Sequence, residues 1–124
     1  MDESIQRAER FLTAISERAD RARIALENDD WDAFDDAMKW KNAAFHNFRA
    51  IDYVLQAKEP NYLMSERWQQ FWTQIRNSET ELSLAIENYQ KNLNQTLLKL
   101  RKTKRAVSRY HSGNADSSGF IDGV

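Results

Sequence analysis

The chain has 124 residues and a formal net charge of −1, and 30% of its residues are charged. This length predicts one domain, and the small net charge excludes an overall electrostatic attraction toward nucleic acid or an anionic membrane. The sequence contains no cysteine, which excludes a disulfide framework and thiol chemistry.

Glycine and proline are almost missing from the first 112 residues. The three glycines are Gly113, Gly119 and Gly123, and the only proline is Pro60. Few segments bounded by turn residues look like strands. The sequence therefore predicts an all-α fold, an antiparallel three- to four-helix bundle in residues 1–110 with one very long helix, followed by a flexible tail over residues 111–124.

The first predicted helix covers residues 3–27, where apolar residues recur at steps of three and four. Asn28-Asp29-Asp30 then interrupts the pattern, and five aspartates fall within residues 29–36. A calcium loop needs alternating ligands, a glycine turn and a closing glutamate, and this stretch lacks them. We expect instead that the aspartates cap the second helix and complement its dipole.

The second predicted helix covers residues 31–58 and has a broad apolar face. Phe45, Phe48 and Ile51 lie on it, and Trp40, Ala43 and Val54 widen it. A face wider than one seam predicts two neighbouring helices, or one neighbour and a ligand. Pro60 disfavours helical backbone at the preceding residue and so predicts the end of this helix.

Aromatic residues gather around the short loop that we predict over residues 60–64. They are Tyr53, Tyr62, Trp68, Phe71 and Trp72. Two interpretations are open, an aromatic cage for a ligand and the packed end of a bundle, of which the packed end is the commoner. Ser65 is the expected cap of the next helix.

The third predicted helix is the longest, residues 65–110, with a break near residues 92–103 left open. Its apolar residues follow heptad rows typical of a coiled-coil seam. It is longer than the two preceding helices, so we expect it to extend past them. Its later apolar residues would then face Phe45, Phe48 and Ile51 across a groove that receives a partner helix; they are Leu93, Leu97, Leu100 and Val107.

The end of this long helix is basic. Residues 1–90 hold eleven basic and seventeen acidic residues, whereas residues 91–111 hold seven basic and no acidic ones. We interpret part of this run as a docking patch for an acidic protein surface, made of Lys99, Arg101, Lys102, Lys104, Arg105 and Arg109. Nucleic acid is a weaker candidate, because no reading module or stacking platform is visible near the patch.

The sequence offers no catalytic constellation. It has no glycine before position 113, no His/Cys cluster for zinc and no Glu-x-x-His pair for di-iron. We therefore expect a binding protein with no enzyme activity, no cofactor and no metal. The charged N-terminus and the lack of a long apolar run add the expectation of a cytoplasmic location without a membrane span.

Three stretches resemble the FliT-type flagellar export chaperones, with the FlgN type as the close relative. The first is the junction over residues 25–34, where an acidic turn leads into Trp31-Asp32. The second is Asn77-Ser78-Glu79 within the long helix. The third is the end of that helix, Val107-Ser108-Arg109-Tyr110, just before the glycine-containing tail. The likeness in layout covers nearly the whole chain.

This resemblance implies a cytoplasmic type III export chaperone. The implied partners are the C-terminal segment of the filament cap protein or, for the FlgN type, the hook–filament junction proteins. The export ATPase complex, the export gate and, in some bacteria, a transcriptional regulator are implied as well. Tyr110 matches the gate-docking tyrosine. The alternative is an adaptor coiled coil that acts by self-association, and the sequence leaves a homodimer open.

Overall fold

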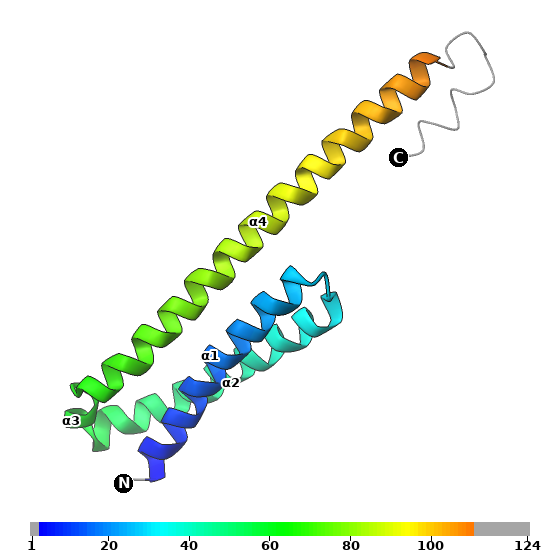
Figure 1. The fold of residues 1–124 in the computed structure, drawn as a ribbon. Helices are drawn as coiled ribbons and strands as arrows, with labels where there is room; N and C mark the ends of the chain where they lie inside the picture. The colour runs from blue at the N-terminus through cyan, green and yellow to red at the C-terminus, as the bar shows by residue number, and fades with distance from the viewer. Residues whose placement is uncertain (1–2, 111–124) are drawn as a thin grey trace. The chain divides into compact units, whose positions relative to one another are not determined.

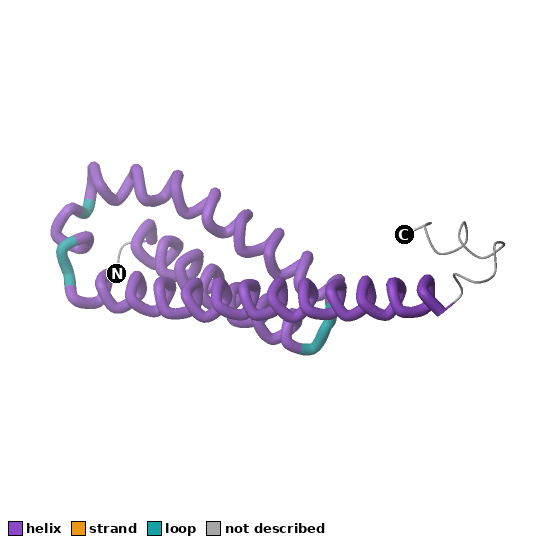
Figure 2. The backbone as a smooth tube through the Cα atoms, turned by 90° about the horizontal axis from the view of Figure 1, so that it is seen from above, coloured by secondary structure: helices purple, strands orange, loops and turns teal. Residues whose placement is uncertain are grey.

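The computed structural model describes residues 3–110, and that range contains helices and turns but no strand (Figures 1 and 2). The four helices are α1 (Glu3–Glu27), α2 (Trp31–Lys58), α3 (Pro60–Leu63) and α4 (Glu66–Tyr110). The all-α prediction is confirmed, and the predicted long helices match α1, α2 and α4 closely. The predicted tail, residues 111–124, lies outside the described residues.

The acidic run between α1 and α2 forms a tight turn. Asp29 has a φ of 57°, a left-handed conformation that a short polar side chain tolerates. Asp30 is the N-cap of α2, and its carboxylate accepts a hydrogen bond from the Ala33 N–H at 3.1 Å. The capping interpretation of this run is therefore confirmed for Asp30.

The turn between α2 and α4 contains the short helix α3 (Pro60–Leu63), where we predicted a short loop. Pro60 occupies the first turn of α3, where the missing N–H of proline costs no hydrogen bond. The Ser65 hydroxyl then accepts a hydrogen bond from the Trp68 N–H at 3.2 Å. This bond confirms the predicted cap of the long helix.

The long helix α4 is continuous over its 45 residues, so the break left open near residues 92–103 is absent. The chain nevertheless divides into two compact units, whose described parts are residues 3–87 and 88–110. The first unit, called the bundle below, contains α1, α2, α3 and the first half of α4. The second half of α4, residues 88–110, is called the terminal segment.

The bundle core is built by α1, α2 and the first half of α4. Ala8, Ala19 and Ala22 of α1 are fully buried, and their small side chains allow neighbouring helices to approach closely. The larger core side chains around them are Leu12, Ile15, Phe48, Leu55, Trp68, Ile75 and Leu82. Burial of these apolar residues is the main stabilising term of the bundle.

Contacts between the helices define their directions. Phe48 stacks against Trp68, and further back along α2 the Lys41 ammonium bonds the Glu79 carboxylate at 2.9 Å, so α2 and α4 are antiparallel. The Ser16 and Ser78 hydroxyls share a buried hydrogen bond of 3.0 Å. Figure 1 shows the turns that connect these helices.

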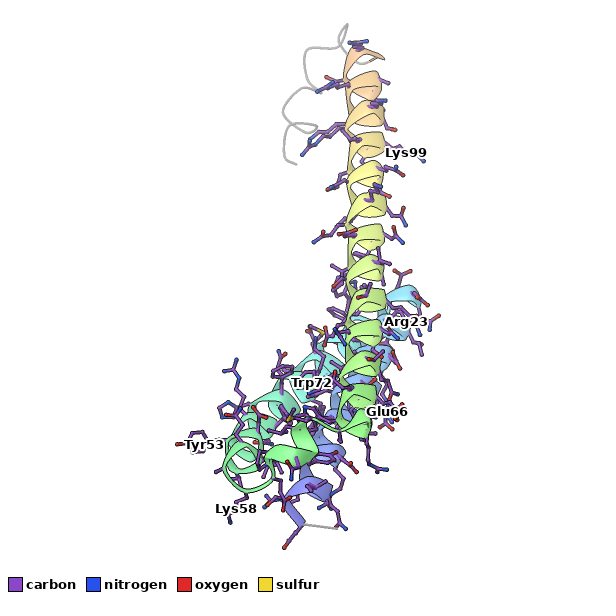
Figure 3. All side chains as sticks on the ribbon, turned by 90° about the vertical axis from the view of Figure 1, so that its left-hand side faces the viewer. Arg23, Tyr53, Lys58, Glu66, Trp72 and Lys99 are labelled. Atoms are coloured by element: carbon purple, nitrogen blue, oxygen red, sulfur yellow. The ribbon has the colours of Figure 1, made fainter. Side chains whose placement is uncertain are left out.

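The aromatic residues near α3 form a packed bundle end. Trp68 contacts the rings of Tyr62, Phe48 and Trp72, with centroids 5.3, 5.8 and 6.0 Å apart. These rings fill space by edge and tilted contacts, as aromatic core residues do. Tyr53 is the exception, because it is exposed and points away from the bundle (Figure 3).

The apolar face of α2 is narrower than predicted. Trp40 is 61% exposed and Ala43 is also exposed, so neither widens the buried face. The Arg18 guanidinium lies over the Trp40 ring, 5.6 Å from its centre, and this cation–π contact explains how a tryptophan is held at the surface.

Two leucines of α4 test this account of the core. Leu82 is fully buried and Leu84, two residues later, is about half exposed. We expect Leu82→Ala to lower the free energy of unfolding by about 2–4 kcal/mol, because it leaves a cavity. The matched variant Leu84→Ala should change it by less than about 0.5 kcal/mol. Urea denaturation followed by circular dichroism measures both, and equal losses would contradict the assigned core.

Candidate partner-binding surface

The structure divides the predicted groove residues into two groups. Phe48 and Ile51 are buried in the bundle core, and Phe45 packs against it. Phe48 meets Trp68 and Trp72 of α4 in that core. The side chains of Phe45, Phe48 and Ile51 therefore pack within the bundle. They could bind a substrate only if the core opened. That role stays a prediction.

The other predicted groove residues are exposed. They are called the exposed row below: Leu93 is 46% exposed, Leu97 43%, Leu100 60% and Val107 41%. All four lie in the terminal segment. They follow one another at steps of four, three and seven, so they lie along one side of the helix. Sequence reasoning found this row but missed Leu98, which is also about half exposed.

The exposed row continues a heptad row that begins inside the bundle. Ile86 is partly buried against the Ala19–Leu82 cluster, and Leu93 and Leu100 follow it at intervals of seven residues. The same helical position is therefore covered in one half of α4 and open to water in the other. Exposed leucines aligned on one face of a helix are typical of a surface that binds another protein.

Basic side chains surround the exposed row. Lys99, Arg101, Lys102, Arg105 and Arg109 of the predicted patch are exposed, and Lys104 is half-buried. Figure 3 shows the side chains of the terminal segment projecting around the helix, Lys99 among them. Residues 88–110 include seven basic and no acidic residues, so the segment carries a net positive charge. The surface therefore combines apolar contact area with a positive potential.

Tyr110 is the last residue of α4. The resemblance implies that Tyr110 docks at the export gate. This role depends on the Tyr110 side chain, which lies outside the described part of the structure.

A separate polar cluster joins α1 to α3 and α4. Arg67 donates two hydrogen bonds to the Glu9 carboxylate, from Nε at 2.5 Å and from Nη2 at 2.8 Å, and the Tyr62 hydroxyl donates a third. The bonds from Arg67, more than any other cause, hold the pKa of Glu9 below its ordinary value. Burial, together with the bond to Glu9, raises the pKa of Tyr62. Sequence reasoning missed this cluster.

This cluster is more consistent with a structural clamp than with a catalytic site. An open depression of about 560 Å³ lies beside it, lined by Arg10, Thr13, Glu17 and Phe71 as well as by Glu9 and Arg67. The Glu9 carboxylate is already occupied by its three donors, which leaves it no free role as a base. Within residues 3–110, no group of three or more His, Asp or Glu side chains is placed to hold a metal ion.

Known proteins add no assignment, because the chain matches no family model, no curated protein and no solved structure. Over the described range, no helix combines the length and apolarity needed to cross a membrane.

The Glu9 cluster predicts a pH dependence of stability. The folded-state pKa of Glu9 lies below its ordinary 4.5, so the stabilisation is complete above pH 4.5 and is lost as the pH falls through the folded pKa. We expect Glu9→Gln to destabilise the bundle by about 1–2 kcal/mol at pH 7 and by less at pH 3. Thermal melts at both values measure this, with Glu17→Gln as the control. A difference between Glu9→Gln and the original chain that is independent of pH would contradict the assignment.

Proposed function

We propose that this chain is a flagellar type III export chaperone of the FliT or FlgN type. It holds a helical segment of an axial protein, in the first instance the C-terminal segment of the filament cap protein, and delivers it to the export apparatus. The observation that carries the proposal is the exposed row of the terminal segment. A helix that presents apolar residues at steps of three, four and seven is suited to bind a second helix.

The residues that carry the family resemblance divide between folding and recognition. Asp30 caps α2. Ser78 forms a hydrogen bond with α1, and Glu79 accepts one from α2. The first two resembling stretches therefore support the bundle. The third stretch, Val107 to Tyr110, ends the terminal segment. This division is what a chaperone with a stable bundle and a separate binding helix requires.

The remaining partners follow from the same proposal. The basic patch, from Lys99 to Arg109, suits acidic surfaces of the export ATPase complex or the export gate, and Tyr110 is the proposed gate contact. A transcriptional regulator is a further proposed partner. Binding at the patch relies on charge, so it weakens as salt increases.

Co-expression tests the proposal directly. The chain is produced with the filament cap protein from the same genome, either full length or without its C-terminal segment, and complexes are separated by size-exclusion chromatography. We expect co-elution with the full-length cap protein only. Co-elution with hook–filament junction proteins instead would assign the FlgN type, and binding to neither would contradict the export role.

A substitution in the exposed row separates binding from folding. We expect Leu97→Asp to weaken binding to the cap protein tenfold or more, because it places a charge in the apolar contact, while helicity and the unfolding midpoint stay close to those of the original chain. Leu84→Asp is the control, since Leu84 is a similarly exposed leucine within the bundle. Isothermal titration and circular dichroism give the two readouts. Equal loss of binding and helicity in Leu97→Asp would make Leu97 a packing residue.

A second candidate function rests on the same exposed row. An adaptor that self-associates through a coiled coil would also present an apolar row at heptad spacing. Sedimentation equilibrium of the chain alone distinguishes the two, because the adaptor would be a stable dimer that Leu100→Ser dissociates.

A further inference from the structure

One charged residue lies within the exposed row itself. Leu93, Leu97, Leu100, Lys104 and Val107 follow one another at steps of four, three, four and three residues, so Lys104 occupies a place in the apolar row. It is also half-buried, unlike its neighbours Lys102 and Arg105, which are exposed. A helix docked on this row would cover the Lys104 side chain, and a covered ammonium needs an opposite charge.

The bundle contains an example of a charged residue in the apolar row of α4 that pairs with an opposite charge on the facing helix. Glu79 lies two heptads before Leu93, in the heptad row that also holds Ile86 and Leu100, and its carboxylate accepts hydrogen bonds from the Lys41 ammonium of α2 at 2.9 and 3.0 Å. The charged position in the covered half of the row is thus matched by an opposite charge on the facing helix. Lys104 lies seven residues after Leu97, in the neighbouring heptad row, and is a charged position of the opposite sign among the apolar residues of the terminal segment.

We infer that the terminal segment binds an acidic amphipathic helix of a partner protein, which presents apolar residues to the exposed row and a Glu or Asp carboxylate to Lys104. This inference deepens the proposed function and rests on it for the identity of the partner, but its chemistry is independent of that identity. Glutamates flanking the partner's apolar residues face the basic side chains on either side of the row.

Charge disfavours a second copy of this chain as the occupant. Residues 88–110 contain only basic charged residues, so pairing two terminal segments would set like charges against each other along the whole contact. The chain's own residues 111–124 are disfavoured by sequence. They hold three glycines, and their large apolar residues are Phe120, Ile121 and Val124, which cannot match four apolar positions spread over fifteen residues of helix.

The test uses the chain of residues 1–124 and two synthetic helical peptides. Both peptides carry leucines at steps of three and four and glutamates at the flanking positions. One has a glutamate within the leucine row, and the other has a lysine at that place. Fluorescence anisotropy at low and moderate salt gives the affinities, and cross-linking with mass spectrometry places the peptide on α4.

We expect the chain to bind the glutamate peptide at least tenfold more tightly than the lysine peptide, and Lys104→Glu to reverse that preference. The control Lys102→Glu makes the same charge change on the opposite side of the helix and should preserve the preference. A preference that Lys102→Glu alters as much as Lys104→Glu does would reduce the effect to net charge and overturn the inference. Failure to bind either peptide would overturn it as well.

The other occupants give distinct results. A dimer of the chain that Leu100→Ser dissociates would assign the row to a second copy. A tenfold gain in peptide affinity from Phe120→Ser with Ile121→Ser would assign it to residues 111–124. Either result overturns the inference.

The export role is tested separately with the cap protein. If the chain binds the glutamate peptide but not the cap protein, the export role fails and this inference stands. If Lys104→Glu holds the cap protein as tightly as the original chain does, this inference fails and the export role stands.

Discussion

Apolar residues along one face of a helix are removed from water only where another helix packs against that face. This need for a covering helix determines which residues of the chain are buried. At roughly 1.5 Å per residue, α1 with 25 residues and α2 with 28 are about 38 and 42 Å long, whereas α4 with 45 residues is about 67 Å long. Two such helices cannot cover all of α4. The buried positions Trp68, Ile75 and Leu82 and the open position Leu100 are the result.

Polar pairs give the covered half of α4 its alignment. Ser16 with Ser78, Lys41 with Glu79 and Glu9 with Arg67 each connect α4 to a different point of α1 or α2. Sliding one helix by a turn would leave the buried side chains of Ser16, Ser78 and Glu9 without partners, which is costly. The apolar core alone tolerates such a shift more readily, because leucine and alanine contacts are less directional.

Most of the fold could be predicted from local sequence. The bounds of α1 and α2 follow from the acidic turn at Asp30 and from Pro60, and α4 follows from a long heptad pattern that no glycine or proline interrupts. The single turn of α3 was missed because four residues are too few to show a period. Trp40 was wrongly expected to widen the buried face of α2. Its surface position depends on a contact with Arg18, and local sequence does not show this contact because Arg18 lies 22 residues earlier in the chain.

The candidate site could be predicted only in part. The exposed row was visible as a continuation of the α4 pattern, but its exposure depends on where α1 and α2 end. Phe48 and Ile51 have the same apolar character as the row, and only the packing of Trp68 and Ile75 shows that they are core. The Glu9 cluster had no local signal, because Glu9 and Arg67 are 58 residues apart and meet only when the bundle closes.

The order of the chain has a consequence for synthesis. Every core residue of the bundle, from Ile5 to Ile86, precedes the terminal segment. At roughly 5–20 residues per second, a ribosome needs about 1–5 s to add residues 88–110. Helical domains of this kind fold in microseconds to milliseconds once their residues are free. The bundle can therefore bury its core before the leucines of the terminal segment follow, so these leucines are added to a chain whose other apolar helix faces are already covered.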